Sequence, residues 1–231
     1  MKLNSLFAGW LHNLRKLTPC LIFIAVLSGF KAFSQPVKIS FIGNCAFKIQ
    51  LDTLLVFSDF PYKSGAYGYM TYTLDSVYHG ERGIALITHK HNDHFSGKEF
   101  SKTKLKRVGP KVSQKQLEKL AKNYGLTVKP IKTRHRWSIK HRSYSVQWRN
   151  RRIYFTGDTE GYDKLIEEKD FDILFITPWL LDKLQKDNLK LKARTIILYH
   201  HDDSQETYRK ENAAICDCEL IAPAQNDAYS L

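Results

Sequence analysis

The sequence predicts an α+β fold in which two β-sheets pack face to face with helices outside, a four-layer αββα sandwich in one domain. Three observations support this prediction. Strand-like segments come in a run, then alternate with helix-like segments, and then the order repeats. Hydrophobic residues make up 43% of the 231-residue chain, which is typical of a globular protein with a core. No Pro/Gly-rich linker and no internal repeat divides the sequence.

Residues 1–34 differ from the rest of the chain and predict a secretory signal peptide. Basic residues precede an apolar run over residues 21–27, and a small-x-small pattern ends at Ser34, next to the expected cleavage point. The apolar run is shorter than the ~20 residues that a membrane-spanning helix needs. We therefore expect a mature domain over residues 35–231, in the periplasm or secreted, with no stable membrane insertion.

Short segments rich in β-branched and aromatic residues predict the strands. In the first half of the chain they cover residues 37–43, 45–51, 54–60, 83–89 and 104–109. In the second half they cover residues 126–135, 144–149, 151–158, 171–177 and 194–201, with a closing pair of strands in residues 219–231. Several are near-continuous apolar runs, such as GIALITH at residues 83–89, and this pattern is typical of strands buried on both faces.

The helices are predicted from their caps and their apolar spacing. Ser113, with Gln116 three residues later, forms a capping-box pattern, and Gly125 ends the amphipathic segment over residues 113–125. A second helix is predicted over residues 204–215. Two further segments are expected to be loops that decide substrate specificity, residues 61–83 and 177–192.

The segment HKHNDH at residues 89–94 brings three histidines and an aspartate together directly after an apolar strand. Residues two apart in an extended segment point the same way, so His89 and His91 can face one metal ion. Asp93 and His94 lie in the turn that follows and can face a second ion. Because neutral imidazole and carboxylate are preferred zinc ligands, this segment predicts a metal site at the end of a strand.

The other ligands of such a site must come from other strand ends. Asp158 follows the apolar strand of IYFTGDT, and Gly157 before it permits close approach of the backbone. A carboxylate has two oxygens, so Asp158 can bridge two cations. Histidines near strand ends are further candidates: His135, His141, His200 and His201. His135 is favoured over His141 because it ends a predicted strand, whereas His141 begins one.

This order of motifs resembles the metallo-β-lactamase-fold superfamily of metal-dependent hydrolases. The resemblance covers roughly residues 37–230 and rests on the series HxHxDH, His, GDT and a strand that ends in His. The ligands that it implies are His89, His91 and His135 for one metal, Asp93, His94 and His200 for the other, and Asp158 as a bridge, together with a water or hydroxide. His141 and His201 stay open as alternatives to His135 and His200.

The resemblance also implies an activity and a cofactor. The implied reaction is hydrolysis by a metal-bridging hydroxide, with Asp93 and Asp158 orienting the nucleophile. Asp59, after the strand LLVFS, matches a position behind the metal ligands, where it would fix the tautomer of an imidazole. The implied cofactor is zinc, with two ions, and Mn²⁺ or Fe²⁺ are alternatives. Asn44 departs from the pattern, because relatives often carry His there.

The charge of the chain indicates the class of substrate. The net charge is +13, and removal of residues 1–34 takes away four basic residues and no acidic one, which leaves +9. We therefore expect a small anionic substrate, a phosphodiester or a phosphorylated lactone, with Arg134, Arg136 and Lys140 near the site. Two alternatives are a single-iron oxygenase of a thiol or persulfide, and a nucleic-acid- or surface-binding module with a structural metal.

The cysteines do not form a disulfide framework. The mature domain has an odd number of them, Cys45, Cys216 and Cys218. Cys216 and Cys218 could form a bridge or a soft metal pair, but an incidental pair is favoured.

Overall fold

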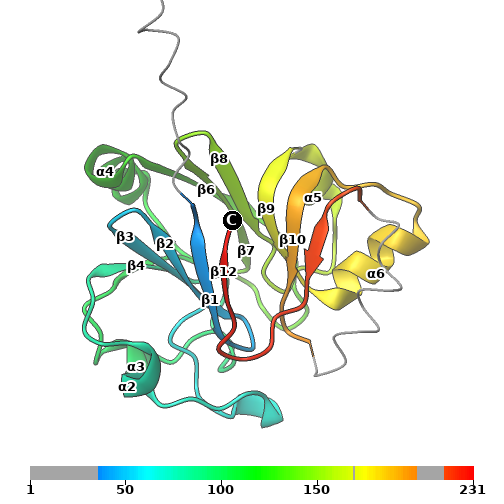
Figure 1. The fold of residues 1–231 in the computed structure, drawn as a ribbon. Coiled ribbons are helices and arrows are strands. Elements are labelled where there is room, and N and C mark those ends of the chain that lie inside the picture. The colour runs from blue at the N-terminus through cyan, green and yellow to red at the C-terminus, as the bar shows by residue number, and fades with distance from the viewer. Residues whose placement is uncertain (1–35, 169, 202–215) are drawn as a thin grey trace, which may run out of the picture. The chain divides into compact units, whose positions relative to one another are not determined.

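The computed structural model describes residues 36–168, 170–201 and 216–231 (Figure 1). The predicted signal peptide and the predicted helix over residues 204–215 lie outside the described residues. In the described part of the chain, none of the helices has the length and hydropathy that a membrane span requires.

The first sheet combines the N-terminal strands with the last strand of the chain. Its strands lie in the order β12 (Ala228–Ser230), β1 (Lys38–Gly43), β2 (Ala46–Leu51), β3 (Leu54–Ser58), β4 (Gly83–Leu86) and β5 (Lys106–Val108). From β12 through β1 and β2 to β3, each strand is antiparallel to the next. From β3 through β4 to β5, each strand is parallel to the next. β3 and β4 therefore end on the same side of the sheet, and Asp59 and Thr88 follow these two ends.

The second sheet has the same mixed character. Its strands lie in the order β11 (Glu219–Ile221), β10 (Ala193–Leu198), β9 (Phe171–Ile176), β8 (Arg151–Phe155), β7 (Arg142–Trp148) and β6 (Leu126–Lys132). β6, β7 and β8 are antiparallel, whereas β8, β9, β10 and β11 run parallel. The parallel strands β8 and β10 thus end on one side, where Asp158 and His200 follow them.

The main core lies between the two sheets, because successive side chains of each strand point to opposite faces. In β9, Ile173 and Phe175 belong to the core between the sheets, whereas Leu174 and Ile176 belong to a second cluster on the outer face. Burying a side chain of this size contributes ~1.5–3 kcal/mol, and here both faces contribute. This arrangement explains the near-continuous apolar runs of the sequence.

Helices cover both outer faces, so the layers follow the predicted order of helix, sheet, sheet and helix (Figure 1). The first sheet is covered by α2 (Leu74–Val77) and α3 (Gly97–Phe100), and the second by α5 (Asp163–Glu167) and α6 (Pro178–Lys186). α4 (Gln114–Tyr124) adds Leu120 to the core between the sheets. It begins at the predicted capping box of Ser113 and Gln116 and ends at Gly125, which is left-handed with φ 60°.

Two expectations about loops and strand pairing are wrong. Residues 177–192 contain α6, in which Leu180, Leu181 and Leu184 are buried against the second sheet, so the expected loop is largely helical. Residues 61–83 contain the short helix α2 and a 3₁₀ turn at Ala66–Gly68. The closing strands do not pair with each other, because β11 pairs with β10 and β12 pairs with β1.

The predicted strand before His135 is too long, and the cysteine pair is bonded. β6 ends at Lys132, and His135 lies in the following loop, where it forms an isolated bridge with Ser138. Cys216 and Cys218 form a disulfide, and Cys45 is a free, buried cysteine.

Candidate metal centre

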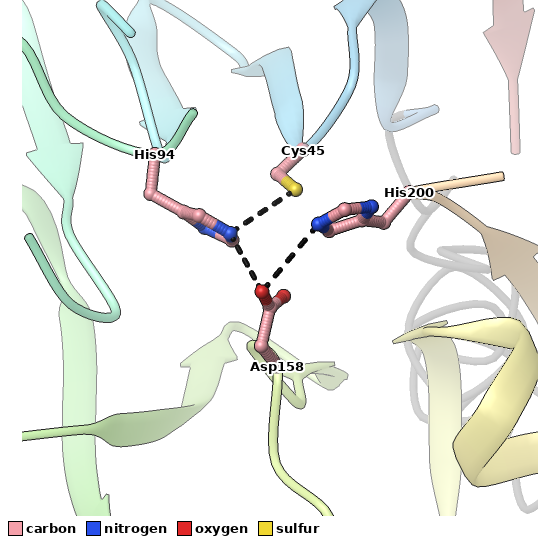
Figure 2. Close-up of side chains that lie close together, drawn as sticks. All are labelled: Cys45, His94, Asp158 and His200. Carbon is pink, nitrogen blue, oxygen red and sulfur yellow. Dashed lines mark hydrogen bonds and ion pairs between the residues drawn. The ribbon is translucent and has the colours of Figure 1, made fainter. Parts of the chain in front are cut away.

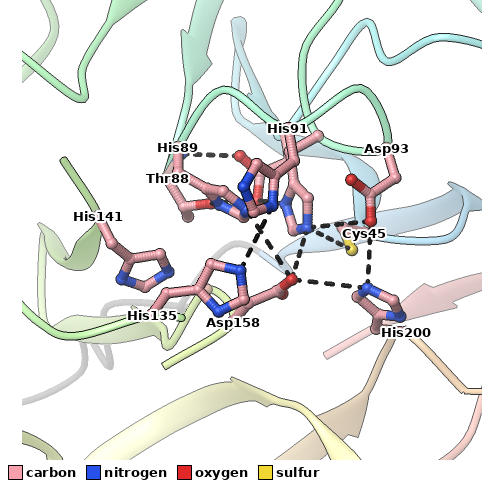
Figure 3. Close-up of polar contacts among 12 residues, drawn as sticks. Cys45, Thr88, His89, His91, Asp93, His135, His141, Asp158 and His200 are labelled. Carbon is pink, nitrogen blue, oxygen red and sulfur yellow. Dashed lines mark hydrogen bonds and ion pairs between the residues drawn. The ribbon is translucent and has the colours of Figure 1, made fainter. Parts of the chain in front are cut away.

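The predicted ligands gather where several strands of both sheets end (Figure 3). His89 follows β4 in the first sheet, and Asp158 and His200 follow β8 and β10 in the second. The turn between β1 and β2 adds a residue that the sequence did not suggest, Cys45. The donor atoms fall into two groups that could each hold a metal ion.

The first group, called the histidine group here, consists of His89, His91 and His135. His91 Nδ1 lies 3.1 Å from His89 Nε2 and 3.3 Å from His135 Nε2. All three donor atoms lie within 4.8 Å of one another. His89 is fully buried, whereas the other two rings are partly exposed. Three converging imidazole nitrogens are a donor set that suits zinc.

The second group, called the mixed group here, consists of Cys45, His94, Asp158 and His200 (Figure 2). His94 Nε2 lies 2.9 Å from Asp158 Oδ2 and 3.5 Å from Cys45 Sγ. His200 Nε2 lies 3.5 Å from the same oxygen of Asp158. Thiol, imidazole and carboxylate together again match the ligands of zinc.

Asp158 and Asp93 connect these donors. Asp158 Oδ2 also lies 4.0 Å from His89 Nε2, so one carboxylate oxygen faces both groups. Asp93 Oδ2 lies 3.3 Å from His200 Nε2 and 3.6 Å from His94 Nε2, beside the mixed group. Figure 3 shows the carboxylate of Asp158 between His135 and His200, with Asp93 above His200 in this view. The predicted bridging position of Asp158 is thus geometrically available.

The donor set fits divalent cations. The second carboxylate oxygens of Asp93 and Asp158 are buried and have no hydrogen-bond partner among the described residues, which is costly unless a cation or an ordered water binds there. Burial alone would lower the pKa of His94, but Asp158 first, then Cys45 and Asp59, outweigh burial and raise it well above its usual value. Negative groups therefore favour positive charge at this point, and a metal ion can supply it.

In the histidine group the pKa values of His89 and His135 are lowered, whereas the pKa of His94 in the mixed group is raised. Burial first, and then the proximity of His94, lowers the pKa of His89 well below its ordinary value. Burial likewise lowers the pKa of His135. Both rings are therefore neutral near neutral pH and keep a lone pair for a metal.

Asp59 supports both groups from behind. Its Oδ2 accepts hydrogen bonds from His94 Nδ1 at 2.9 Å and from Thr88 Oγ1 at 2.8 Å. Thr88 Oγ1 in turn lies 3.1 Å from His89 Nδ1. The other oxygen of Asp59 accepts from the Thr88 backbone N–H at 2.7 Å. These contacts leave the Nε2 atoms of His89 and His94 facing the site.

The two open histidine alternatives occupy different places from the grouped residues. His141 is buried beside His135, and its Nδ1 lies 2.7 Å from Thr133 Oγ1. A Cβ at Gly157 would lie 2.5 Å from His141 Nε2, so the left-handed glycine makes room for this ring. His201 is buried with its ring 6.1 Å from that of Phe41, and it belongs to neither group.

Asn44, the departure from the expected pattern, ties ligand segments together. Its side-chain amide donates to the carbonyl oxygen of Asp93 at 2.8 Å, and its own carbonyl accepts from the backbone N–H of His200 at 2.9 Å. The adjacent Cys45 is thereby held beside the mixed group. In the sequence, Cys45 is marked only by its place beside Asn44, in a turn before an apolar strand, and this position does not indicate a metal ligand.

An open pocket of about 620 Å³ leads to both groups. Its walls carry the aromatic residues Tyr67, Tyr69, Trp137 and Trp179. Trp179 and Tyr69 pack edge-on against the ring of His200, at 5.1 and 4.7 Å between centroids. Of the basic residues expected near the site, Lys140 lines a neighbouring pocket, whereas Arg136 stacks on Trp137.

Comparisons with known proteins find matches only among solved structures. No family model matches the sequence, and no curated protein matches it. The metallo-beta-lactamase fold protein YhfI from Bacillus subtilis matches with a TM-score of 0.63 and 14% identity, over 85% of this chain and 99% of that one. A metallo hydrolase from the archaeon Ignicoccus hospitalis gives a TM-score of 0.58 and 12% identity, over 85% and 98%. A diphosphatase from the PhnP family gives 0.51 and 13%, over 85% and 98%.

These likenesses extend over nearly all the described residues and agree with the layers seen here. Two mixed sheets with helices outside carry a cluster of His, Asp and Cys side chains at the strand ends. The chain therefore has the metallo-β-lactamase fold, as its motifs predicted, with a candidate metal centre at the site where those motifs meet.

Proposed function

We propose that the chain is a metal-dependent hydrolase of an anionic ester, a phosphodiester or a phosphorylated lactone, that works with two zinc ions. One observation carries this proposal: two donor groups meet at Asp158 on the floor of an open pocket. The similar structures include a metallo hydrolase and a diphosphatase, which supports hydrolysis and, for the latter, a phosphate substrate.

The residues divide the work according to their contacts. The histidine group would hold one ion, and the mixed group with Asp93 would hold the other. Bound divalent ions supply a water of lowered pKa and polarise the bond under attack. Asp59 keeps His94 oriented through its hydrogen bond at 2.9 Å.

Asp93 and Asp158 would handle the water and its proton. Each has one buried oxygen without a partner among the described residues, so each can accept a hydrogen bond from a water. The water oxygen adds to phosphorus or to the carbonyl carbon, and the bond to the leaving oxygen breaks. A carboxylate takes the proton of the water and returns it to the leaving oxygen.

The aromatic walls of the pocket would contact the leaving group. Tyr67 and Trp137 have 67% and 83% of their surfaces exposed, which leaves their rings free to pack against an apolar or planar group. Specificity would thus depend on residues 61–83, on the loop around Trp137 and on Trp179 of α6.

Metal content and turnover, measured together, test the proposal. We expect about two zinc or manganese ions per chain by mass spectrometry, and turnover of bis(p-nitrophenyl) phosphate that a chelator abolishes. One iron per chain with oxygen consumption would favour thiol or persulfide oxidation instead. A folded chain without bound metal would contradict the hydrolase.

We also propose that residues 1–34 direct export of the domain, on the basis of their basic and apolar pattern. The mass of the chain recovered from periplasm or culture medium tests this, because cleavage after Ser34 predicts a new N-terminus at Gln35. A chain that keeps residues 1–34 and stays inside the cell would contradict it.

A further inference from the structure

A second pocket, of about 400 Å³, lies next to the candidate metal centre. It shares His91 and Trp137 with the pocket that leads to both metal-binding groups. A ligand that reaches the metal centre can therefore extend into this second pocket without leaving the protein surface.

The second pocket is strongly basic. Four of its lining residues, Lys90, Arg107, Lys111 and Lys140, are basic, and none of the lining residues is acidic. We call these four residues the basic quartet. All four are exposed, and none forms an ion pair with a carboxylate among the described residues. The charge of this pocket is thus left for a ligand to neutralise.

The members of the quartet repel one another. Lys90, Lys111 and Lys140 line the same pocket, so their ammonium groups bring like charges together. Ammonium groups can only donate hydrogen bonds, so adjacent lysines cannot satisfy each other. An oxyanion such as phosphate can accept from both at once and remove the repulsion.

The segment that carries Lys111 is held in place by the fold. Tyr144 donates a hydrogen bond to the carbonyl oxygen of Ile87 at 2.9 Å and lies 3.4 Å from that of Val108. At Gly109, with φ +90°, a Cβ would meet the Tyr144 hydroxyl at 1.6 Å, so the chain can turn here only as glycine. The backbone that carries Lys111 is therefore fixed at the end of β5 before any ligand binds.

We propose that the basic quartet binds a second phosphate group of the substrate, so that the substrate carries one phosphate at the metal centre and another in this pocket. The inference rests on the proposed hydrolase function and narrows its substrate to molecules with two phosphate groups. The second phosphate is bound and not attacked. Exposed Ile139, which also lines the pocket, provides apolar contact between the two phosphates.

Binding of bisphosphonates tests this inference without requiring turnover. Calorimetry on the zinc-supplied full chain would compare alkane bisphosphonates of increasing chain length with the matching monophosphonates. We expect at least one bisphosphonate to bind about tenfold or more tightly than its monophosphonate, which corresponds to one charged hydrogen-bonding contact. The double variant Lys111→Ala/Lys140→Ala should lose this advantage.

A matched control separates the pocket from overall charge. Lys119→Ala/Lys122→Ala removes two exposed charges from α4, away from both pockets, and should keep the bisphosphonate advantage. No advantage in the wild-type chain, or one that survives in the Lys111/Lys140 variant, would overturn the inference. An equal loss in both double variants would also overturn it, because only bulk charge would then matter.

The hydrolase itself is tested separately, by turnover of bis(p-nitrophenyl) phosphate, which has a single phosphate. Turnover of this ester without any bisphosphonate advantage would overturn the second phosphate site and leave the hydrolase standing. A bisphosphonate advantage that depends on the quartet, in a chain that hydrolyses no ester, would support the phosphate site and contradict the hydrolase.

Discussion

The histidine group and the mixed group lie side by side, yet they differ in charge and in exposure. The histidine group has three imidazoles and no charged donor, and two of its rings are partly exposed. The mixed group adds a carboxylate and a thiol, and all its members except His200 are buried. Because anionic donors attract a divalent cation more strongly than neutral ones, the mixed group should bind the tighter ion, and the histidine group the one that faces substrate.

The hydrogen bonds that orient the ligands also favour the mixed group over the histidine group. His94 of the mixed group bonds directly to Asp59, whereas His89 reaches Asp59 only through Thr88. His135 Nδ1 lies 3.9 Å from the exposed carboxylate of Glu160. A buried, fixed side chain loses less conformational freedom when it binds a metal ion than an exposed one does. This should further increase the difference in metal affinity between the mixed group and the histidine group.

The largest effect is expected at Asp158, whose carboxylate oxygen Oδ2 faces both groups. Asp158→Asn keeps the size of the side chain but removes its charge and one acceptor. Both ions should bind more weakly and turnover should fall by more than the ~100-fold that loss of a supporting contact costs. Mass spectrometry of bound metal and an ester assay check this, with exposed Asp75→Asn as the control. Unchanged metal content and turnover would exclude a bridging role.

Next in size is His135→Ala, which should remove the ion of the histidine group only. We expect one retained metal per chain, because the donors of the mixed group do not include this residue. Metal counting on His135→Ala, His141→Ala and exposed His79→Ala tests the choice between the two loop histidines. If His141→Ala loses the ion and His135→Ala keeps it, the assignment is reversed.

A smaller effect is expected at Asp59, which belongs to neither donor group. Asp59→Asn should weaken the ion of the mixed group by ~10- to 100-fold, and the other ion less, because His94 loses its direct partner. Competition with a chelator measures the affinity of each group for its metal ion. A thermal melt shows whether the variant is folded. Equal weakening of both ions in a folded variant would contradict the unequal support described above.

The smallest effect is expected at Cys45, because Asp93 lies beside the same group and can compensate. Cys45→Ser should lower zinc affinity about tenfold, the lower end of such losses. The clearer measurement is the absorption of the cobalt-substituted protein, where a thiolate ligand gives a sulfur-to-cobalt charge-transfer band. The wild-type chain should show this band and the variant should not. Its absence from the wild-type chain would remove Cys45 from the ligand set.

The parts of the fold that were predictable have local signals. HKHNDH and the capping box of α4 are complete within a few residues, and the apolar runs mark strands wherever both faces are covered. The signal for α6 was also present, since Leu180, Leu181 and Leu184 have helical spacing.

The features that escaped prediction depend on contacts between distant segments. Cys45 meets His94 only because the turn between β1 and β2 lies against the loop after β4, 49 residues later. The basic quartet likewise joins residues from three separate segments around β4, β5 and the loop before β7. The pairing of β11 and β12 is equally non-local, because β11 joins β10 in the second sheet whereas β12 joins β1 in the first.

Each donor group takes members from both sheets, and this has a thermodynamic consequence. His89 and Cys45 follow strands of the first sheet, whereas His135, Asp158 and His200 follow strands of the second. An ion held by either group therefore acts as a cross-link between the two halves of the sandwich. By linkage, a ligand at 100 times its dissociation constant stabilises the folded state by ~2.7 kcal/mol. The melting temperature should then rise with metal concentration, and occupancy can be followed without any substrate.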